Sequence, residues 1–274
     1  MSHFIYADHA ATTAVSDTAL QAMLPHFTTA YGNPSSLYRF AQEGKTDLER
    51  ARAEIAACLN ARPEEIYFTS GGTEADNWAL RGVAELMALK GRKGGHIITS
   101  AIEHHAVLHT AQYLEKQGYE VTYLPVDGRG LVDPAALEGA IRPDTILISI
   151  MAANNEIGTI EPVAELGRIA RAHKVLFHTD AVQAVGHIPV DVEAWNVDLL
   201  SLSAHKFRGP KGVGALYVKK PLRLPALIQG GGQEKGRRSG TENVPGAVGM
   251  AAALWSFAVA LLLGFGEVLG DTLI

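Results

Sequence analysis

The sequence predicts an α/β fold with a mainly parallel sheet flanked by helices. Short apolar and β-branched runs alternate along most of the chain with longer segments of helical spacing, which is the order of βα units. Small polar residues follow the end of nearly every apolar run, where a parallel sheet places its ligand sites. With 274 residues, the chain is long enough to bury a large core.

The composition excludes several classes of protein. The 24 Lys and Arg residues against 29 Asp and Glu give a net charge of −5, so we expect no nucleic-acid partner. No basic segment precedes an apolar one at the N-terminus, so we expect no secretory signal. A single cysteine, Cys58, excludes an intrachain disulfide. These features predict a protein of the reducing cytoplasm.

The elements are expected in a regular order. Residues 5–33 form loops round a short helix, and residues 48–59 form an amphipathic helix whose apolar stripe includes Cys58. We interpret that thiol as a small buried hydrophobe rather than a nucleophile. Strands are expected at residues 66–69, 96–99, 121–125, 145–151, 175–179, 197–202 and 213–218, and further helices at 75–86, 106–117, 134–141 and 163–173.

The C-terminal stretch differs in kind from the rest. Residues 244–266 carry no charge, and residues 251–263 are apolar almost without interruption. A membrane span needs about 20 apolar residues, so length alone permits one. The small residues, Pro245 and the lack of basic flanks favour a buried helix or a non-native end instead. We therefore expect no membrane partner.

Lys206 is the strongest catalytic candidate. The apolar run of residues 197–202 leads into Ser203-Ala204-His205-Lys206, and a Gly/Pro loop follows. A lysine at the end of a buried strand can lose its proton by desolvation and become the neutral nucleophile that forms an imine with an aldehyde. A lone lysine in such a loop is more often simply solvated, so the interpretation depends on the other polar clusters.

A glycine turn after residues 66–69 predicts an anion site. The turn contains Gly71, Gly72 and Thr73, and a helical pattern begins directly after it. Free amides and the positive end of the helix dipole attract a phosphate there, and the glycines allow its close approach. An ordinary capped turn has the same local sequence. Because GxxxxGK[ST] and GxGxxG motifs are both absent, ATP and dinucleotides are not favoured as ligands.

Three further residues suit an aldehyde cofactor that carries a phosphate and a ring nitrogen. Asp180 can keep the ring nitrogen protonated, Gln183 can donate to the phenolic oxygen, and His104 can stack on the ring. Ser203 and His205 can join Gly72 and Thr73 at the phosphate. Asp180 could equally be a helix N-cap on local sequence.

A metal site is the alternative for the histidines. His105 and His109 have the i,i+4 spacing of a metal pair, but no acidic or thiol ligand is suitably spaced near them. No HExxH motif is present either. We therefore predict no metal.

Eight segments together resemble the cysteine desulfurases. They occur in the expected order from about residue 4 to residue 253. The segments are Ala7-Asp8-His9-Ala10-Ala11-Thr12-Thr13, Gly32-Asn33-Pro34-Ser35-Ser36, Phe68-Thr69-Ser70-Gly71-Gly72-Thr73-Glu74-Ala75, Glu103-His104-His105-Ala106-Val107-Leu108, Asn154-Asn155-Glu156-Ile157-Gly158, His178-Thr179-Asp180-Ala181-Val182-Gln183, Ser203-Ala204-His205-Lys206 and Arg237-Arg238-Ser239-Gly240-Thr241-Glu242-Asn243.

The resemblance implies a fold type I, class V aminotransferase-like enzyme that depends on pyridoxal 5′-phosphate. Such an enzyme removes sulfur from L-cysteine and gives L-alanine and an enzyme-bound persulfide for iron–sulfur cluster or thio-cofactor synthesis. The resemblance also implies a homodimer and a sulfur-acceptor or scaffold protein as partner.

The resemblance implies a role for each site residue. Lys206 would be the Schiff-base lysine and His104 the stacking histidine. Asn154 would lie near the substrate carboxylate, and Thr241 would reach the phosphate in the partner subunit. The ring contacts would be Asp180 and Gln183, and the other phosphate contacts Thr73, Ser203 and His205.

The sequence departs from the family pattern towards its C-terminus. The family continues into a small C-terminal domain with a persulfide-forming cysteine on a mobile loop and an arginine for the substrate carboxylate. We expect a large cofactor domain with its N-terminal segment at residues 1–253, an aberrant apolar tail at residues 254–274, and no small domain. Cys58 precedes the cofactor motifs and cannot replace the missing nucleophile. We therefore expect this chain to form the cofactor imine without producing persulfide.

Two other functions remain open at this point. One is a related class V enzyme, such as a selenocysteine lyase, a cysteine sulfinate lyase or an aminotransferase. The Asn154 to Gly158 segment and the Arg-Ser-Gly-Thr segment favour a desulfurase over these. The other is a non-catalytic remnant that binds a partner or a membrane through its apolar tail.

Overall fold

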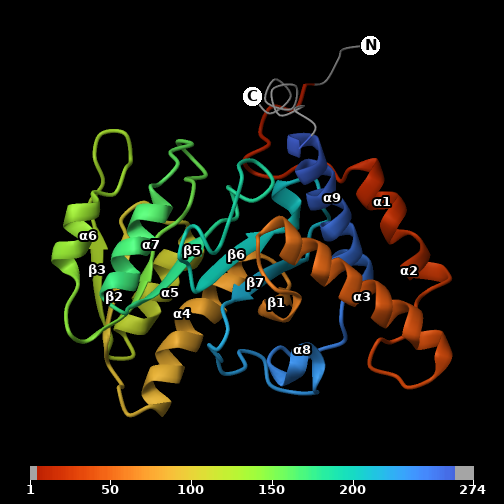
Figure 1. Cartoon of the computed structure of the whole chain (residues 1–274), viewed down its shortest axis with the longest axis horizontal. Helices are drawn as coiled ribbons and strands as arrows, with labels where there is room; N and C mark the ends of the chain where they lie inside the picture. Colours follow the sequence, from red (N-terminus) through yellow and green to blue (C-terminus); the bar gives the residue numbers. More distant parts are fainter. Residues whose placement is uncertain (1–4, 263–274) are drawn as a thin grey trace.

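A seven-stranded sheet forms the centre of the molecule in the computed structural model, which describes residues 5–262 (Figure 1). All seven strands that the sequence predicts are present, in the order β1-β7-β6-β5-β4-β2-β3. Their bounds are Ile66–Thr69 (β1), His96–Ser100 (β2), Glu120–Leu124 (β3), Thr145–Ser149 (β4), Leu176–Asp180 (β5), Leu199–Ser203 (β6) and Gly214–Val218 (β7).

The sheet is mainly parallel, as predicted. Strands β3, β2, β4, β5 and β6 pair in parallel, while β7 runs antiparallel to both β6 and β1. Because β7 is reversed, β1 points the same way as β6. The carboxyl ends of six strands therefore lie along one edge of the sheet, which is where ligands of α/β proteins bind.

Side chains of alternate strand residues enter two separate cores. Tyr67 and Ile97 pack with Trp78 and Leu80 of helix α4 (Gly72–Leu89), and helix α5 (His105–Glu115) lies on the same side. Neighbouring strand residues, such as Ile98, point into the other core. Helices α3 (Arg39–Cys58), α6 (Pro134–Ala140), α7 (Val163–Ala172) and α9 (Val244–Leu262) contribute residues to that second core. Figure 1 labels all four helices. Both faces of the sheet are thus covered, as the near-continuous apolar strands require.

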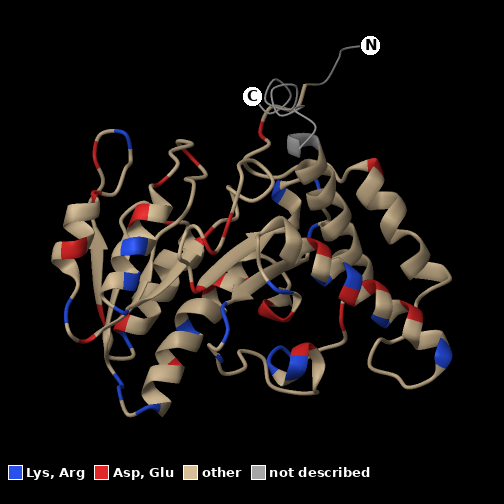
Figure 2. Cartoon of the chain, viewed as in Figure 1, with Lys and Arg blue, Asp and Glu red and all other residues tan. Residues whose placement is uncertain are grey.

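Helix α9 packs against α3 and against α1 (Asp17–Met23), which is followed by the short helix α2 (Pro25–Thr28). Its residues Val244, Met250 and Leu254 are buried, and its sequence carries no charge, in contrast to the mixed charges of α3 (Figure 2). The helix continues past residue 253, and residues 263–274 lie outside the described part. The division into residues 1–253 and 254–274 therefore stays a prediction. No helix within residues 5–262 is both long and apolar enough to cross a membrane.

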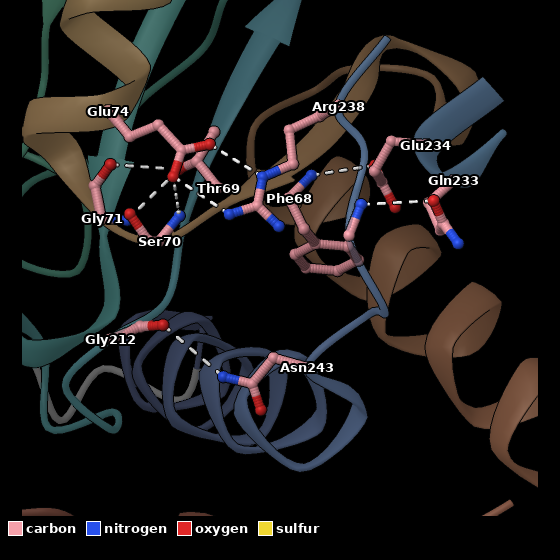
Figure 3. A network of polar contacts seen from close by, with 11 residues as sticks. Phe68, Thr69, Ser70, Gly71, Glu74, Gly212, Gln233, Glu234, Arg238 and Asn243 are labelled. Carbon is pink, nitrogen blue, oxygen red and sulfur yellow. Dashed lines mark hydrogen bonds and ion pairs between the residues drawn. The ribbon is translucent and has the colours of Figure 1, made fainter. Parts of the chain in front are cut away.

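A buried ion pair connects α3 to a distant loop. Arg52 donates through both terminal nitrogens to the Glu234 carboxylate, with both N–O distances 2.8 Å, and it also donates to the Ile66 carbonyl. Glu234 belongs to α8 (Gln233–Gly236) and accepts a hydrogen bond from the Phe68 amide (Figure 3). Both charged side chains are only 3% exposed. The pair therefore fixes residues 228–243 against β1.

Replacement of Arg52 by methionine should lower the free energy of unfolding by about 3–5 kcal/mol, because Glu234 is then left charged and buried without its partner. Chemical denaturation at neutral pH measures this change. Arg50→Met is the matched control on the same helix, since the Arg50 side chain is 60% exposed and its ion pair with Asp47 should contribute less than about 1 kcal/mol. Equal losses for the two variants would contradict the assignment.

Candidate active site

A cavity of about 460 Å³ lies at the carboxyl edge of the sheet. It brings together eight of the ten site residues that the sequence predicts, from four different strand ends. These eight are Gly72, Thr73, His104, Asp180, Gln183, Ser203, His205 and Lys206.

Asn154 lies beside this cavity rather than in it. It lines a neighbouring cavity of about 370 Å³, which shares Ala10 and Gln183 with the first. Its side-chain amide donates to the Ile102 carbonyl at 2.9 Å, and its carbonyl oxygen accepts the Glu156 amide at 2.8 Å. These bonds close the loop after β4. Asn154 therefore shapes the loop that carries Asn155 and Glu156 into the site.

Thr241 lies away from both cavities. It is exposed, on the segment that precedes α9, and it is not among the residues that line either space. In the described part of a single chain, the structure does not bring Thr241 to the other predicted phosphate residues.

The glycine turn after β1 forms one end of the main cavity. Helix α4 begins at Gly72, and the Ala75 amide donates a hydrogen bond to the Gly71 carbonyl at 3.2 Å. The amides that precede Ala75 in the first turn therefore have no helical partner and are available to an anion. A Cβ on Gly72 would lie 2.6 Å from the Val182 side chain, so only glycine fits this approach.

Asp180 ends β5 at the floor of the cavity. Its carboxylate accepts the Val182 amide at 2.9 Å, and the residue is 5% exposed. Burial raises the pKa of Asp180, while the Val182 amide, His104 and Lys206 act in the opposite direction. The carboxylate is thus fixed in orientation but has no basic side chain bonded to it.

Lys206 follows β6 in a short 3₁₀ turn, Ala204–Lys206. Its amine donates to the backbone carbonyls of Ala10 and Ala11. Burial lowers the pKa of Lys206, although the carboxylates of Asp180, Asp8 and Glu156 partly offset this effect. The amine therefore releases its proton more easily than a solvated lysine, as nucleophilic attack requires.

His104 is the N-cap of α5. Its Nδ1 accepts the Ala106 amide at 3.1 Å, which fixes the imidazole at the mouth of the cavity. Because Nδ1 is an acceptor, the neutral ring carries its hydrogen on Nε2. The ring is consequently oriented by the backbone and not by a second side chain.

The N-terminal segment contributes contacts that the sequence did not reveal. The Ala10 carbonyl accepts hydrogen bonds from both Lys206 and Gln183, and Thr13 bonds to the His205 carbonyl. Backbone acceptors have no side-chain signature. The only available signal was the cluster of small polar residues at residues 7–13.

Asp76 is a further residue that sequence reasoning missed. It lies one helical turn after Gly72, lines the cavity, and is 1% exposed. One of its carboxylate oxygens has no hydrogen-bond partner and lies 3.6 Å from His178 Nε2. Burial and the nearby Asp180 raise the pKa of Asp76 well above its usual range, although the Ser201 hydroxyl opposes this shift. A carboxylate on the apolar face of a predicted helix was the signal that could have identified it.

His178 is a buried neighbour of the Asp76 carboxylate. It precedes Asp180 by two residues and so faces the same side of β5. Its ring nitrogens contact the hydroxyls of Ser149 at 2.8 Å and Ser201 at 3.0 Å. Burial lowers the pKa of His178 to about 3, so the ring is neutral at physiological pH.

Glu103 is a third buried carboxyl near the site. One oxygen accepts bonds from the Ser100 hydroxyl at 2.7 Å and from the Met151 amide at 2.9 Å, so it links the ends of β2 and β4. Burial raises the pKa of Glu103 to about 8, although these two hydrogen bonds partly oppose the shift.

Glu103 should make stability depend on pH. The folded protein keeps this proton up to about pH 8, whereas the unfolded chain loses it near the ordinary pKa of 4.5. The stability that the protonated Glu103 carboxyl contributes is therefore fully present below pH 4.5 and is lost as the pH rises to about 8. Glu103→Gln keeps an accepting oxygen and cannot ionise. The difference in unfolding free energy between this variant and the wild type should therefore shift in favour of the variant as the pH rises from 4.5 to about 8. Urea denaturation at several pH values tests this, and parallel pH profiles would contradict it.

His105 and His109 stack, with ring centroids 4.9 Å apart and an angle of 12° between the ring planes. Among the residues that the structure describes, no group of three or more potential metal ligands occurs. The prediction that no metal binds stays a prediction.

Cys58 lies in a separate small cavity beside Leu254 and Phe257. Burial, together with Glu54, raises the pKa of its thiol to about 11. The thiol is therefore uncharged at neutral pH, and Cys58 does not line the cavity that contains Lys206.

Comparison with known proteins shows which family the chain resembles. The model of the aminotransferase class-V family matches residues 5–259. The chain is 57% identical over 249 residues to the cysteine desulfurase IscS of Methanosarcina thermophila, covering 91% of this chain and 61% of that protein. It is 55% identical over 254 residues to the cysteine desulfurase IscS of Clostridium botulinum, covering 93% of this chain and 63% of that protein.

Solved structures give the same result. A NifS-like protein superimposes with a TM-score of 0.91 at 47% identity, over 94% of this chain and 71% of that one. The structure named "SspA in complex with cysteine" gives a TM-score of 0.90 at 41% identity, over 98% of this chain and 78% of that one. The chain spans 61–63% of the length of the two IscS relatives. On this evidence the chain belongs to the aminotransferase class-V family, in which it is similar to cysteine desulfurases named IscS and to a NifS-like protein.

Proposed function

We propose that this chain is the cofactor-binding part of a cysteine desulfurase, which binds pyridoxal 5′-phosphate on Lys206 and takes L-cysteine as substrate. The observation that carries the proposal is the convergence of Lys206, Asp180 and His104 in one cavity that also receives the N-terminus of α4. The names of the IscS relatives and the cysteine complex of SspA support the choice of substrate.

The residues present fit this cofactor at each of its functional groups. Its phosphate suits the free amides at the start of α4, with Thr73, Ser203 and His205 beside them. Its ring nitrogen suits the Asp180 carboxylate, and its phenolic oxygen suits Gln183. Its aldehyde requires an amine of lowered pKa, which Lys206 provides. When bound, pyridoxal phosphate supplies an electron sink for a substrate carbanion.

The side chains around the ring have distinct tasks in this proposal. Asp180, oriented by the Val182 amide, holds a proton on the ring nitrogen. His104, whose imidazole is fixed by the Ala106 amide, would cover one face of the ring. The Lys206 amine would be the base that takes the proton from the substrate Cα and holds it for return. Glu156 and Asn155, on the loop that Asn154 shapes, line the substrate side.

A second copy of the chain completes the site in this proposal. Thr241 is exposed and lies outside its own cavity, so it is available to the phosphate of a partner subunit. We further propose a sulfur-acceptor or scaffold protein as partner, a role in iron–sulfur cluster or thio-cofactor synthesis, and a cytoplasmic location.

Lys206→Ala should abolish the visible absorbance that develops when pyridoxal phosphate binds covalently to the protein. Borohydride reduction followed by peptide mass mapping should place the label on Lys206 in the wild type. Lys211→Ala is the matched control, because Lys211 is an exposed lysine of the following loop and should leave both signals intact. Label distributed over exposed lysines, or retained in Lys206→Ala, would contradict the assignment.

This 274-residue polypeptide should bind the cofactor but should not turn over L-cysteine. Persulfide formation needs a thiol at the site, whereas the sole cysteine, Cys58, is protonated and lies in another cavity. The purified, cofactor-loaded polypeptide should therefore release neither alanine nor sulfide from L-cysteine at a steady rate. Amino-acid analysis of the reaction mixture measures this, and sustained alanine production would disprove it.

A further inference from the structure

Glu74 places a negative charge close to the proposed phosphate position. It lies in the first turn of α4, directly after Thr73, and its side chain is 11% exposed. Its Oε2 accepts the Ser70 amide at 2.9 Å, which closes the glycine turn (Figure 3). An acidic group is favourable at a helix N-terminus in isolation, but it repels any second anion that binds at the same end.

Arg238 pairs with this carboxylate from the distant segment of residues 228–243. Its Nε donates to Glu74 Oε1 at 2.8 Å and its Nη2 to Oε2 at 3.1 Å, so the contact is bidentate (Figure 3). Burial acts to raise the pKa of Glu74, but the hydrogen bonds from Arg238 and Ser70 outweigh it and leave the pKa below its ordinary value. The pair is therefore fully ionised at neutral pH.

The segment around Arg238 is itself firmly held. Ser239 donates to the Gly231 carbonyl at 2.8 Å, and the Gly240 amide bonds to the Gln233 side chain at 3.2 Å. Glu234 ties the same segment to Phe68. The guanidinium of Arg238 is therefore fixed beside the turn, although Arg238 and Glu74 do not line the cavity.

We propose that Glu74 and Arg238 have opposite effects on the affinity of the site for phosphate, although neither residue lines the cavity. Glu74 closes the turn but opposes an incoming phosphate, and Arg238 cancels that opposition. The inference rests on the proposed function, because the phosphate is that of the proposed cofactor. It assigns a positioning and electrostatic role to two residues that touch neither the cofactor nor the substrate.

The test compares the dissociation constants of pyridoxal phosphate and of pyridoxal, which lacks the phosphate, by absorbance titration at pH 8 and low ionic strength. Arg238→Met should weaken pyridoxal phosphate binding about three- to tenfold, because Glu74 is then uncompensated. Glu74→Gln should strengthen it by about two- to fivefold, since Arg238 is then an unpaired cation near the phosphate. The double variant should lie close to the wild type, and no variant should change the binding of pyridoxal more than about twofold.

Two controls separate charge from structure. Arg238→Lys keeps the positive charge and should keep the wild-type ratio of the two dissociation constants. Arg237→Met removes the neighbouring arginine, which lies over the Tyr67 ring and does not bond to Glu74, and should also leave the ratio unchanged.

The outcomes distinguish this inference from the proposed function. Weaker binding in both single variants, or equal effects on pyridoxal phosphate and pyridoxal, would show a purely structural ion pair and overturn the inference alone. A wild type that binds the two compounds equally would overturn the phosphate site itself, and the inference with it.

Discussion

The parallel alignment of β1, β5 and β6 is the constraint on which the site depends. Pairing of Asp180 with Ser201, and antiparallel pairing of β7 with both β1 and β6, bring three strand ends to one edge. Each end contributes one chemical group: the helix N-terminus after β1, the carboxylate of β5, and the amine after β6. A shift of register by one residue would turn Asp180 to the opposite face of the sheet and separate it from the cavity.

Beneath that edge, three carboxyl groups are buried with few basic side chains near them. Asp76, Glu103 and Asp180 are each no more than 5% exposed, and the neutral His178 lies among them. Desolvation raises the pKa of all three carboxyls, so the region favours bound protons over multiple charges. By contrast, the Arg238–Glu74 pair keeps its charges, because the Glu74 carboxylate accepts two hydrogen bonds from the guanidinium and its pKa is lowered. The Arg52–Glu234 pair has the same bidentate geometry.

Features that arise from local sequence were predictable, and those that depend on distant backbone were not. Apolar runs gave all seven strands, and the position of Lys206, Asp180 and Gly72 directly after such runs gave the core of the site. Asp76 was missed because helical spacing alone does not reveal what covers a polar residue. The Arg238–Glu74 pair spans 164 residues, and the Ala10 carbonyl has no side-chain signal, so neither could be found without the fold.

The hydrogen bonds from Lys206 to Ala10 and Ala11 have a consequence for how the site fills. An ammonium or amine group can satisfy both carbonyls, but a nitrogen committed to a covalent bond with a ligand has fewer hydrogens to donate. The first residues of the described chain therefore compete with any aldehyde for the same nitrogen. Any group that bonds covalently to this nitrogen must therefore displace hydrogen bonds within the chain itself. Gln183 donates to the Ala10 carbonyl and Thr13 donates to the His205 carbonyl, so the N-terminal segment also has contacts to the site that do not involve the Lys206 amine.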